Sequence, residues 1–509
     1  MQPLTFLLFA VYGLAVLLLF IYGVNGYYMM YQFARNRRRA EAGQAQIARD
    51  YWARTRPEDL PAVTIQLPIY NEQYVVERLI RHACHIEYPA DKLEIQVLDD
   101  STDETRDLVA LIVARQRELG HDIRHIRRPD REGYKAGALQ HGMSVCRGEF
   151  IAIFDADFMP EKDFLHKTIP YFSDPGIALV QTRWGHVNAD YSLLTMAQSI
   201  GIDGHFAIEQ AGRTWGGLFM NFNGTAGIWR KRAIETAGGW ESDTLTEDMD
   251  LSYRAQLVGW RMAFLPAVET PAEIPVDINA FKSQQHRWAK GSIQTALKIL
   301  PMLFAADQPL RRKVQAVIHM THYLVHPLMV TVALLSVPML QEFELNVGPA
   351  VFGLLVLGLL VSTSGPSSLY VFSQRYLNPT SWRRKAAFIP ALMFVGTGIA
   401  ISNTKAVLEA LFGIDSAFVR TPKLNVTLKG ESVADRAKYR MPLRPIFLLE
   451  LLMGAYCFAG FLLYVQSGKY LIGPFLLIYT IGFTYTAILS ILHSLEAEAG
   501  ALAEKPVNA

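Results

Sequence analysis

A chain of 509 residues is too long for one compact core, so its length predicts two or more structural units. With 51% hydrophobic and 19% charged residues, it is too apolar for an ordinary soluble enzyme and too charged for a pure membrane bundle. The net charge of +2 argues against a nucleic-acid binder. The widely spaced Cys84, Cys146 and Cys457 fit no metal-binding spacing and favour a reduced, cytosolic setting for the soluble part.

The N-terminal apolar stretch, Leu4 to Tyr31, is long enough to cross a bilayer. No lysine or arginine precedes it, which is unlike a secretory signal. The basic run Arg35 to Arg39 follows it, so the positive-inside rule places the N-terminus outside and the next region in the cytoplasm. Residues 1–34 are therefore predicted to form a transmembrane anchor.

Residues 60–300 are predicted to form a soluble α/β domain. Buried strands are expected at Val63–Leu67, Leu93–Leu98, Ile123–Ile126 and from Phe150, with helices between them, including Tyr134–Val145. Strands that alternate with helices imply a mostly parallel sheet. Ligands of such sheets bind at the carboxyl ends of the strands.

Two further spans are predicted in residues 314–373, at Val314–Leu340 and Pro349–Phe372. The loop between them carries acids but no lysine or arginine, and the loop after them is basic. The first loop is therefore expected outside and the second in the cytoplasm.

Residues 381–445 are predicted to hold an interfacial segment and a basic loop. Phe388–Asn403 is broken by a proline and two glycines, so we expect an interfacial or re-entrant segment rather than a span. The basic region Arg420–Arg444 then stays cytoplasmic. A final hairpin in residues 446–493, made of Ile446–Val465 and Tyr470–Leu492, brings the total to five spans and leaves the C-terminus in the cytoplasm.

The strand that begins at Phe150 ends in Asp155 and Asp157. Residues i and i+2 of an extended chain lie on the same side, so both acids can face one point. Hard oxygen ligands there suit Mg²⁺ or Mn²⁺ carrying a diphosphate. The alternative is a solvated turn after a strand.

Acids also end the second strand, where Asp99 and Asp100 can accept hydrogen bonds from a nucleotide. The alternative is a turn that caps the next helix. Lys135, at the start of the helix that follows the third strand, can hold a phosphate. Its alternative is a solvated surface lysine.

Two motifs lie further along the domain. In Thr246-Glu247-Asp248 we expect Asp248 to remove a proton from an acceptor hydroxyl, with Glu247 assisting or orienting it. The alternative is a helix N-terminus with Thr246 as its cap, which is compatible with a catalytic acid there. Gln284, Arg287 and Trp288 can bind a diphosphate and a sugar ring, or can simply belong to an amphipathic helix near the membrane.

In this order, the motifs resemble those of the family 2 glycosyltransferases, and among them the processive cellulose, chitin and hyaluronan synthases, over roughly residues 60 to 445. The resemblance implies a GT-A-type α/β domain with a helical transmembrane bundle. It makes Tyr70 and Glu72 part of the nucleotide-binding loop and one of Asp99 and Asp100 the first acid. It assigns the metal to Asp155 and Asp157, the base to Asp248, and acceptor and pyrophosphate to Gln284, Arg287 and Trp288.

The segment Ala417–Lys423 resembles the gating loop of cellulose synthase, with Phe418, Thr421 and Lys423 as its substrate-contacting residues. Arg420 and Pro422 depart from the cellulose synthase pattern and look more like the cellulose-synthase-like mannan synthases. The alternative is a basic loop held to anionic lipid.

The resemblance implies an inverting enzyme of the plasma (inner) membrane. It would polymerise a β-linked hexose from UDP-glucose or GDP-mannose and pass the glycan through its own helices. Expected partners are the nucleotide sugar, the growing glycan or a lipid acceptor, and membrane lipid, with no nucleic acid.

Four polar residues are expected on the first helix of the bundle: His319, His322, Tyr323 and His326. They would line the glycan path or pack against neighbours. Alternatives are a single-transfer enzyme acting on a ceramide or polyprenyl phosphate, and a transporter or scaffold with an inactive domain.

Overall fold

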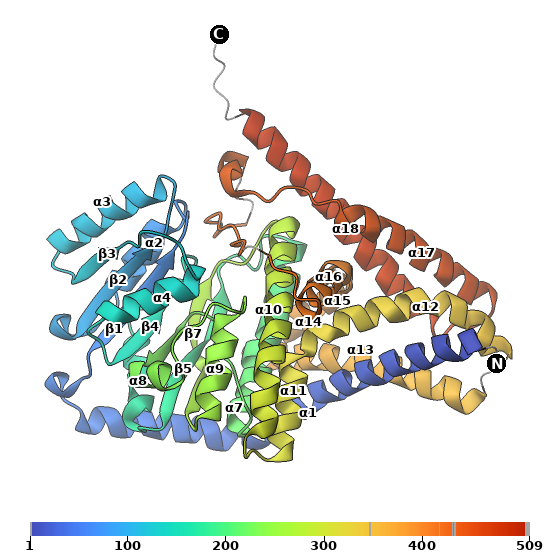
Figure 1. The fold of residues 1–509 in the computed structure, drawn as a ribbon, viewed down its shortest axis with the longest axis horizontal. Coiled ribbons are helices and arrows are strands. Elements are labelled where there is room, and N and C mark those ends of the chain that lie inside the picture. Colours follow the sequence, from blue (N-terminus) through green and yellow to red (C-terminus); the bar gives the residue numbers. More distant parts are fainter. Residues whose placement is uncertain (1–2, 346–347, 417, 430, 432–433, 504–509) are drawn as a thin grey trace, which may run out of the picture.

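The protein consists of an α/β domain joined to a bundle of long helices (Figure 1). The structure, a computed structural model, describes residues 3–345, 348–416, 418–429, 431 and 434–503. Ala417, the first residue of the predicted gating loop, lies outside the described residues. The domain and the bundle lie on opposite sides of helix α10, Ile278–Ala305 (Figure 1).

The domain is built on a seven-stranded sheet with the strand order β3-β2-β1-β4-β6-β5-β7. Only β6 runs antiparallel to its neighbours, so the prediction of a mostly parallel sheet is confirmed. Strands β2 and β3 lie on one side of β1 in the sheet, and β4 lies on its other side. The strand order therefore reverses between β1 and β4, and ligands of such sheets bind at this topological switch point. The strands are β1 Val63–Ile69, β2 Leu93–Asp99, β3 Ile123–Ile126, β4 Phe150–Ile153, β5 Ile177–His186, β6 Gly227–Arg230 and β7 Arg261–Ala272.

Strands β1, β2 and β4 are short and buried on both faces, as expected when helices cover a parallel sheet on each side. One face packs against α2 (Val76–Cys84), α3 (Thr105–Glu118) and α5 (Phe164–Thr168). The other packs against α4 (Tyr134–Val145), α7 (Ala211–Trp215), α8 (Lys231–Thr236) and α9 (Glu247–Leu257). The predicted strands and the helix at 134–145 are present, and β5, β6 and β7 extend the sheet beyond the prediction.

Helix α1, Pro3–Arg54, is far longer than the predicted anchor of residues 1–34. It contains no proline after its first residue, and its basic run consists of good helix formers, so nothing stops the helix where the membrane stretch ends. At 1.5 Å per residue it is roughly 80 Å long, against about 30 Å of bilayer core. Its second half packs on the α/β domain, where Phe33 stacks on Trp215 with ring centroids 5.3 Å apart.

Five described helices are long and apolar enough to cross a membrane: α1, α12 (Val325–Leu345), α13 (Pro349–Leu377), α17 (Ile446–Gln466) and α18 (Gly473–Ala503). This agrees with the predicted transmembrane bundle of about five spans. The predicted span Val314–Leu340 is wrong in its first part, because α11, Leu310–Met320, ends before a turn at His322–Leu324 and α12 starts anew. Pro327 in the first turn of α12 lacks an N–H and disfavours a helical residue before it, which favours a new helix start.

The segment predicted to be interfacial or re-entrant forms two helices, α15 (Ile389–Gly398) and α16 (Ala400–Leu411), after the short α14 (Trp382–Ala386). The stretch Trp382–Gly398 and α16 are bent by 44° to each other, so together they form a broken span or a re-entrant segment. Gly398 lets α15 touch α18 closely, because a Cβ there would lie 2.4 Å from Gly482 O. Helix α6 (Leu193–Asp203) and the π-helical segment Gly204–Gln210 connect this region to the sheet.

Candidate functional site

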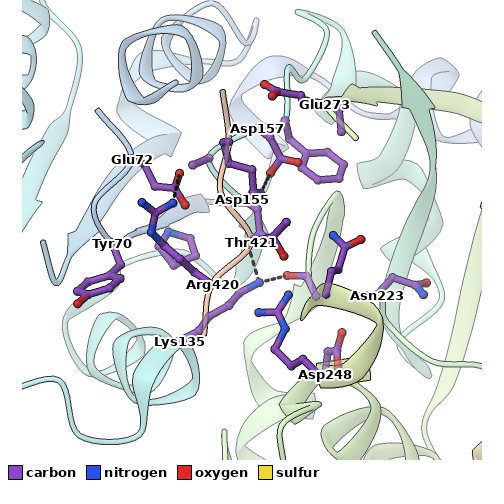
Figure 2. A pocket seen from close by; sticks show the side chains of 18 of the residues that line it. Tyr70, Glu72, Lys135, Asp155, Asp157, Asn223, Asp248, Glu273, Arg420 and Thr421 are labelled. Carbon is purple, nitrogen blue, oxygen red and sulfur yellow. Dashed lines mark hydrogen bonds and ion pairs between the residues drawn. The ribbon is translucent and has the colours of Figure 1, made fainter. Parts of the chain in front are cut away.

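A cleft with a cavity of about 170 Å³ opens at the carboxyl ends of β1 and β4 (Figure 2). Loops from the sheet, helices α4, α9 and α10, and the loop 418–423 form its walls. The structure places all of the predicted site residues but Asp99 on this cleft: Tyr70, Glu72, Asp100, Lys135, Asp155, Asp157, Glu247, Asp248, Gln284, Arg287, Trp288, Phe418, Thr421 and Lys423.

The acid pair follows β4, and each acid has a cationic partner. Asp155 Oδ1 lies 2.6 Å from Lys135 Nζ, and the Asp155 main-chain N–H donates to Thr225 Oγ1 at 2.9 Å. Asp157 forms an ion pair with Lys423 of the loop. Two carboxylates close together are electrostatically unfavourable, and the two lysines offset this charge.

Lys135 joins α4 to the far side of the cleft. Besides Asp155, its Nζ donates to Gly224 O at 2.8 Å. Burial lowers the pKa of Lys135, but the charges of Asp155 and Glu247 outweigh it and raise the pKa above the ordinary value. The lysine therefore stays protonated and available to an anion.

Two further carboxylates lie beside the acid pair. Burial raises the pKa of Glu72 to about 7, although Arg420, with Nη1 3.2 Å from Glu72 Oε2, opposes the shift. Glu273, at the end of β7, accepts from Leu424 N at 2.9 Å, and burial raises its pKa as well. This end of the cleft thus gathers four carboxylates, which is the donor set that a hard divalent cation prefers.

Asp248 lies in the first turn of α9. Burial first, and then the neighbouring Glu247, raise the pKa of Asp248 to about 7. Thr246 occupies the N-cap position of this helix, as predicted, but its side chain makes no capping bond, because its Oγ1 lies 3.0 Å from Thr295 Oγ1 on α10. Gly224 takes a left-handed backbone conformation with φ of 81° and lies against the carboxylate: a Cβ there would be 3.0 Å from Asp248 Oδ2.

Helix α10 carries Gln284, Arg287 and Trp288 into the cleft. Burial lowers the pKa of Arg287, while Glu247 and Asp155 favour its charged form. Gly291, one turn later, permits close contact with the segment before α9, since a Cβ there would lie 2.9 Å from Thr246 N. This close approach of the α10 backbone to the start of α9 brings Arg287 and the acids of α9 into the same site.

The loop 418–423 closes one side of the cleft (Figure 2). The Phe418 ring stacks on Tyr134 at 5.6 Å, and the Arg287 guanidinium lies 4.6 Å from its centroid. Thr421 is 4% exposed, and its Oγ1 has no hydrogen-bond partner among the described residues. A buried hydroxyl without a partner is costly, which fits a site that receives a polar ligand.

The acids after β2 separate into two environments. Asp100 faces the cleft and receives both Arg128 Nε at 2.9 Å and Nη2 at 2.6 Å. Asp99 is buried, paired with His125 Nε2 at 2.8 Å and with Ser101 N at 2.8 Å. Asp100 thus lines the cleft and Asp99 does not, because successive residues of a strand point to opposite faces and Asp99 points into the fold. That one of the two contacts the nucleotide stays a prediction.

Several cleft residues were missed by the sequence reasoning. Trp184 and His186, at the end of β5, have a buried Nε1 and a buried Nδ1 without partners among the described residues. Asn223 lines the same cleft, across from Glu72 in Figure 2. The apolar run at 177–180 and the Asn223-Gly224 turn were the available signals.

Two other groups of polar residues lie outside the cleft. Glu241, Asp243 and Asp250 converge, but Lys298 pairs with all three of them. The four residues expected on one helix lie on three elements, with His319 on α11, His322 and Tyr323 in the turn, and His326 on α12. His319 Nδ1 lies 2.7 Å from Tyr253 OH and His326 Nε2 2.9 Å from Asn403 Nδ2, as in packed helices, and a role in a glycan path stays a prediction.

Known proteins are similar in sequence to much of the chain. Residues 61–291 match the model of a glycosyltransferase-like family 2. Glucomannan 4-beta-mannosyltransferase 9 of Arabidopsis thaliana is 47% identical over 236 residues, 45% of this chain and 44% of the relative, so the chain spans about half the length of such relatives. Glucomannan 4-beta-mannosyltransferase 7 of the same plant is 34% identical over 444 residues, 83% of this chain and 75% of the relative.

A solved mannosyltransferase of Pyrobaculum calidifontis, in complex with GDP-Man and Mn²⁺, is 19% identical and covers 77% of this chain and 99% of its own, with a TM-score of 0.46. That likeness is too distant to inform the site. The 34% identity to a plant relative, over 75% of that relative's length, identifies the family of this chain. The chain belongs to glycosyltransferase family 2, as a relative of the glucomannan 4-beta-mannosyltransferases.

Proposed function

We propose that this protein is a membrane-embedded, inverting glycosyltransferase that moves a hexosyl group from a nucleotide sugar to the end of a growing β-glycan. The observation that carries the proposal is the position of Asp248 on the same cleft as the acid pair, with a pKa raised to about 7 by burial and by Glu247. A general base works best when its pKa lies near the working pH.

Asp155 and Asp157 would hold a divalent cation, Mg²⁺ or Mn²⁺. The fit rests on hard carboxylate oxygens, two from the pair and more from Glu72 and Glu273 nearby, and on two lysines that now offset their charge. Such an ion, when bound, supplies Lewis-acid stabilisation to a diphosphate leaving group. Tyr70, Glu72 and Asp100 line the part of the cleft where the nucleotide would bind, at the ends of β1 and β2.

In the reaction, Asp248 takes the proton of an acceptor hydroxyl, with Glu247 in support. The hydroxyl oxygen forms a bond to the anomeric carbon while the bond from that carbon to the diphosphate breaks, so the configuration inverts. Lys135 and Arg287 face the cleft with their positive charges and stabilise the charge that develops on the leaving diphosphate. Gln284 and Trp288, on the same helix as Arg287, hold the acceptor sugar.

The curated relatives are named for 4-beta-mannosyl transfer to glucomannan, so we propose GDP-mannose as the first donor to test and UDP-glucose as the second. We place the catalytic domain and the C-terminus in the cytoplasm and the N-terminus outside a plasma (inner) membrane, from the basic residues after the apolar stretches. The glycan would pass between the membrane helices. A single-transfer enzyme with a lipid acceptor is the competing function, since it needs the same acids and cation.

The test is release of nucleoside diphosphate by detergent-purified protein given GDP-mannose, UDP-glucose or control nucleotide sugars, with Mg²⁺ or Mn²⁺. One donor should support release and incorporation of labelled hexose, and Asp248→Asn should abolish both. Equal release by wild type and Asp248→Asn would refute the assigned base. No release from any donor would refute the enzymatic function.

A further inference from the structure

The side chain of Asn223 is held by residues that lie outside the reaction cleft. The Asn223 Oδ1 lies 2.8 Å from Gln210 Nε2, and the Asn223 Nδ2 lies 3.1 Å from His205 Nε2. The main-chain N–H of Asn223 donates to Gln181 Oε1 at 3.1 Å. The next residue, Gly224, lies against Asp248. A rigidly held amide therefore lines the same cleft as Asp248 and directly precedes the glycine that lies against it (Figure 2).

The direction of each hydrogen bond follows from one main-chain group. Gln210 Nε2 lies 2.9 Å from Asn221 O, and a carbonyl only accepts, so this end of Gln210 is the amide nitrogen. Asn223 must then turn its oxygen to Gln210 and its nitrogen to His205. His205 Nε2 accepts, which puts the imidazole proton on Nδ1, where it donates to Glu209 Oε2 at 3.1 Å.

This series of hydrogen bonds ends in an ion pair between the buried Arg213 and the partly exposed Glu209. Arg213, which is 0% exposed, donates from Nε at 3.1 Å and from Nη2 at 2.9 Å to Glu209 Oε1. Burial alone would raise the pKa of Glu209, but Arg213 and then His205 hold it well below the ordinary value. The carboxylate stays charged and fixes the tautomer of His205.

The backbone of the segment that carries His205 and Gln210 places both residues next to Asn223. His205 and Gln210 lie on the π-helical segment Gly204–Gln210, in which residues five apart are neighbours in successive turns. In an α-helix, residues five apart point roughly 140° away from each other, so His205 and Gln210 would not meet the same side chain. The π-helical turn thus lets both residues hold Asn223, and such turns occur often at functional sites.

We propose that His205, Glu209 and Arg213 are positioning residues that fix the Asn223 amide, and that Asn223 binds adjacent hydroxyls of the hexose held against Asp248. An asparagine amide has two N–H groups and two acceptor lone pairs, and the protein bonds use one of each. The remaining N–H and lone pair form a donor–acceptor pair, which matches two neighbouring hydroxyls of a pyranose. The hexose is that of the donor or that of the acceptor, and the inference rests on the proposed function.

The experiment compares Asn223→Ala, Asn223→Asp, His205→Phe and His205→Gln with wild type, with exposed His141→Phe as the matched control. Loss of one hydrogen bond to a neutral sugar lowers the rate by about tenfold. Asn223→Ala should lower kcat/KM by about 10- to 100-fold and His205→Phe by about 10-fold. Asn223→Asp keeps the shape of the side chain but cannot donate an N–H, so its kcat/KM should be lowered as much as that of Asn223→Ala. His205→Gln can accept from Asn223 and donate to Glu209, so it should stay close to wild type.

Two assays separate the sources of the hexose. Rates are measured for hydrolysis of the nucleotide sugar without acceptor and for transfer to an added manno-oligosaccharide, beside the binding of free nucleoside diphosphate. A fall in transfer with unchanged hydrolysis and a raised acceptor KM assigns Asn223 to the acceptor, and a fall in both assigns it to the donor. Nucleoside diphosphate binding should not change in either case.

The inference is overturned if Asn223→Ala and His205→Phe, folded with wild-type thermal stability, stay within about twofold of wild type in both assays. It is also overturned if His205→Gln is as impaired as His205→Phe, because then the hydrogen-bond chain has no role beyond packing. Wild-type protein that turns over no nucleotide sugar in the same assays would refute the proposed function and this inference with it.

Discussion

Lys423 of the loop 418–423 forms an ion pair with Asp157, the second acid after β4. Both side chains are largely buried, at 15% and 8% exposure, so solvent screens the pair only weakly. The loop therefore contacts the carboxylate to which we assign the cation. We therefore expect the loop and the cation to compete for Asp157 in the absence of substrate, and a diphosphate that binds both to relieve the competition.

Lys423→Met should tighten the binding of Mn²⁺ alone by about fivefold or more, since one charge near the cation is worth roughly 1 kcal/mol. It should weaken the binding of the nucleotide sugar, which loses a cationic partner. Calorimetry measures both. Lys438→Met is the matched control, because Lys438 pairs with Asp103 and Glu104 outside the cleft. Unchanged affinity for the metal in Lys423→Met would contradict the competition.

Asp248→Asn should lower kcat by about 10³-fold or more while nucleotide binding stays nearly intact, because a base acts on the acceptor and not on the donor. In wild type, the base works deprotonated, so kcat/KM should fall as the pH drops below about 7, the raised pKa of Asp248. Asp243→Asn, outside the cleft and paired with Lys298, is the control. A donor affinity that falls as steeply as kcat would make Asp248 a donor or metal ligand instead.

The same raised pKa of Asp248 has a consequence for stability. The folded protein binds the proton more tightly than the unfolded chain, so this contribution to stability is complete below the unfolded value near 4 and is lost as the pH rises through about 7. Asp248→Asn should therefore raise the thermal unfolding temperature above pH 7 more than at pH 5. Thermal scans at both values test this. An equal shift at both would mean that Asp248 is not protonated at neutral pH in the folded protein.

Phe418→Ala combined with Thr421→Ala should cut glycan synthesis severely and leave the fold intact, because both side chains line the cleft and Phe418 packs on Tyr134. A cysteine in place of Val419, which is 40% exposed on the same loop, offers a second readout, since the native Cys84, Cys146 and Cys457 are buried. An impermeant thiol reagent should label it only from the cytoplasmic side, and less with nucleoside diphosphate bound. Labelling from outside intact cells would contradict the topology and the closing role of the loop together.

Gly291→Val should lower activity at least about tenfold and weaken the binding of nucleotide sugar. A side chain at Gly291 would meet Thr246 Cγ2 at 2.6 Å and Leu245 C at 2.9 Å, which pushes α10 away from α9 and moves Arg287 and the acids apart. Gly43→Val on α1 is the matched control, since a Cβ there meets nothing within 4 Å. Kinetics at saturating donor measure the effect. Full activity in Gly291→Val would show that the helix contact does not set the geometry of the site.

The sequence predicted the part of the fold that local patterns specify. Apolar runs with acids at their ends located β1, β2 and β4 and nearly every cleft residue they carry, and long apolar stretches located the five helices able to span. The sequence could not choose between Asp99 and Asp100, because side-chain direction at a strand end depends on the pleat and on His125, 26 residues away from Asp99. Asn223, Trp184 and His186 were missed because their roles arise only when β5 and β6 pair with distant strands.

The size of the product tests the account most directly. Purified protein is given the donor that supports turnover, a divalent cation and an excess of short manno-oligosaccharide, and the products are resolved by length from the earliest time points. We expect long β-linked chains, degraded by an endo-β-mannanase if the sugar is mannose, that appear while most of the acceptor is still unextended. Transfer of one sugar to a lipid, with no oligosaccharide extended in any condition, would contradict it.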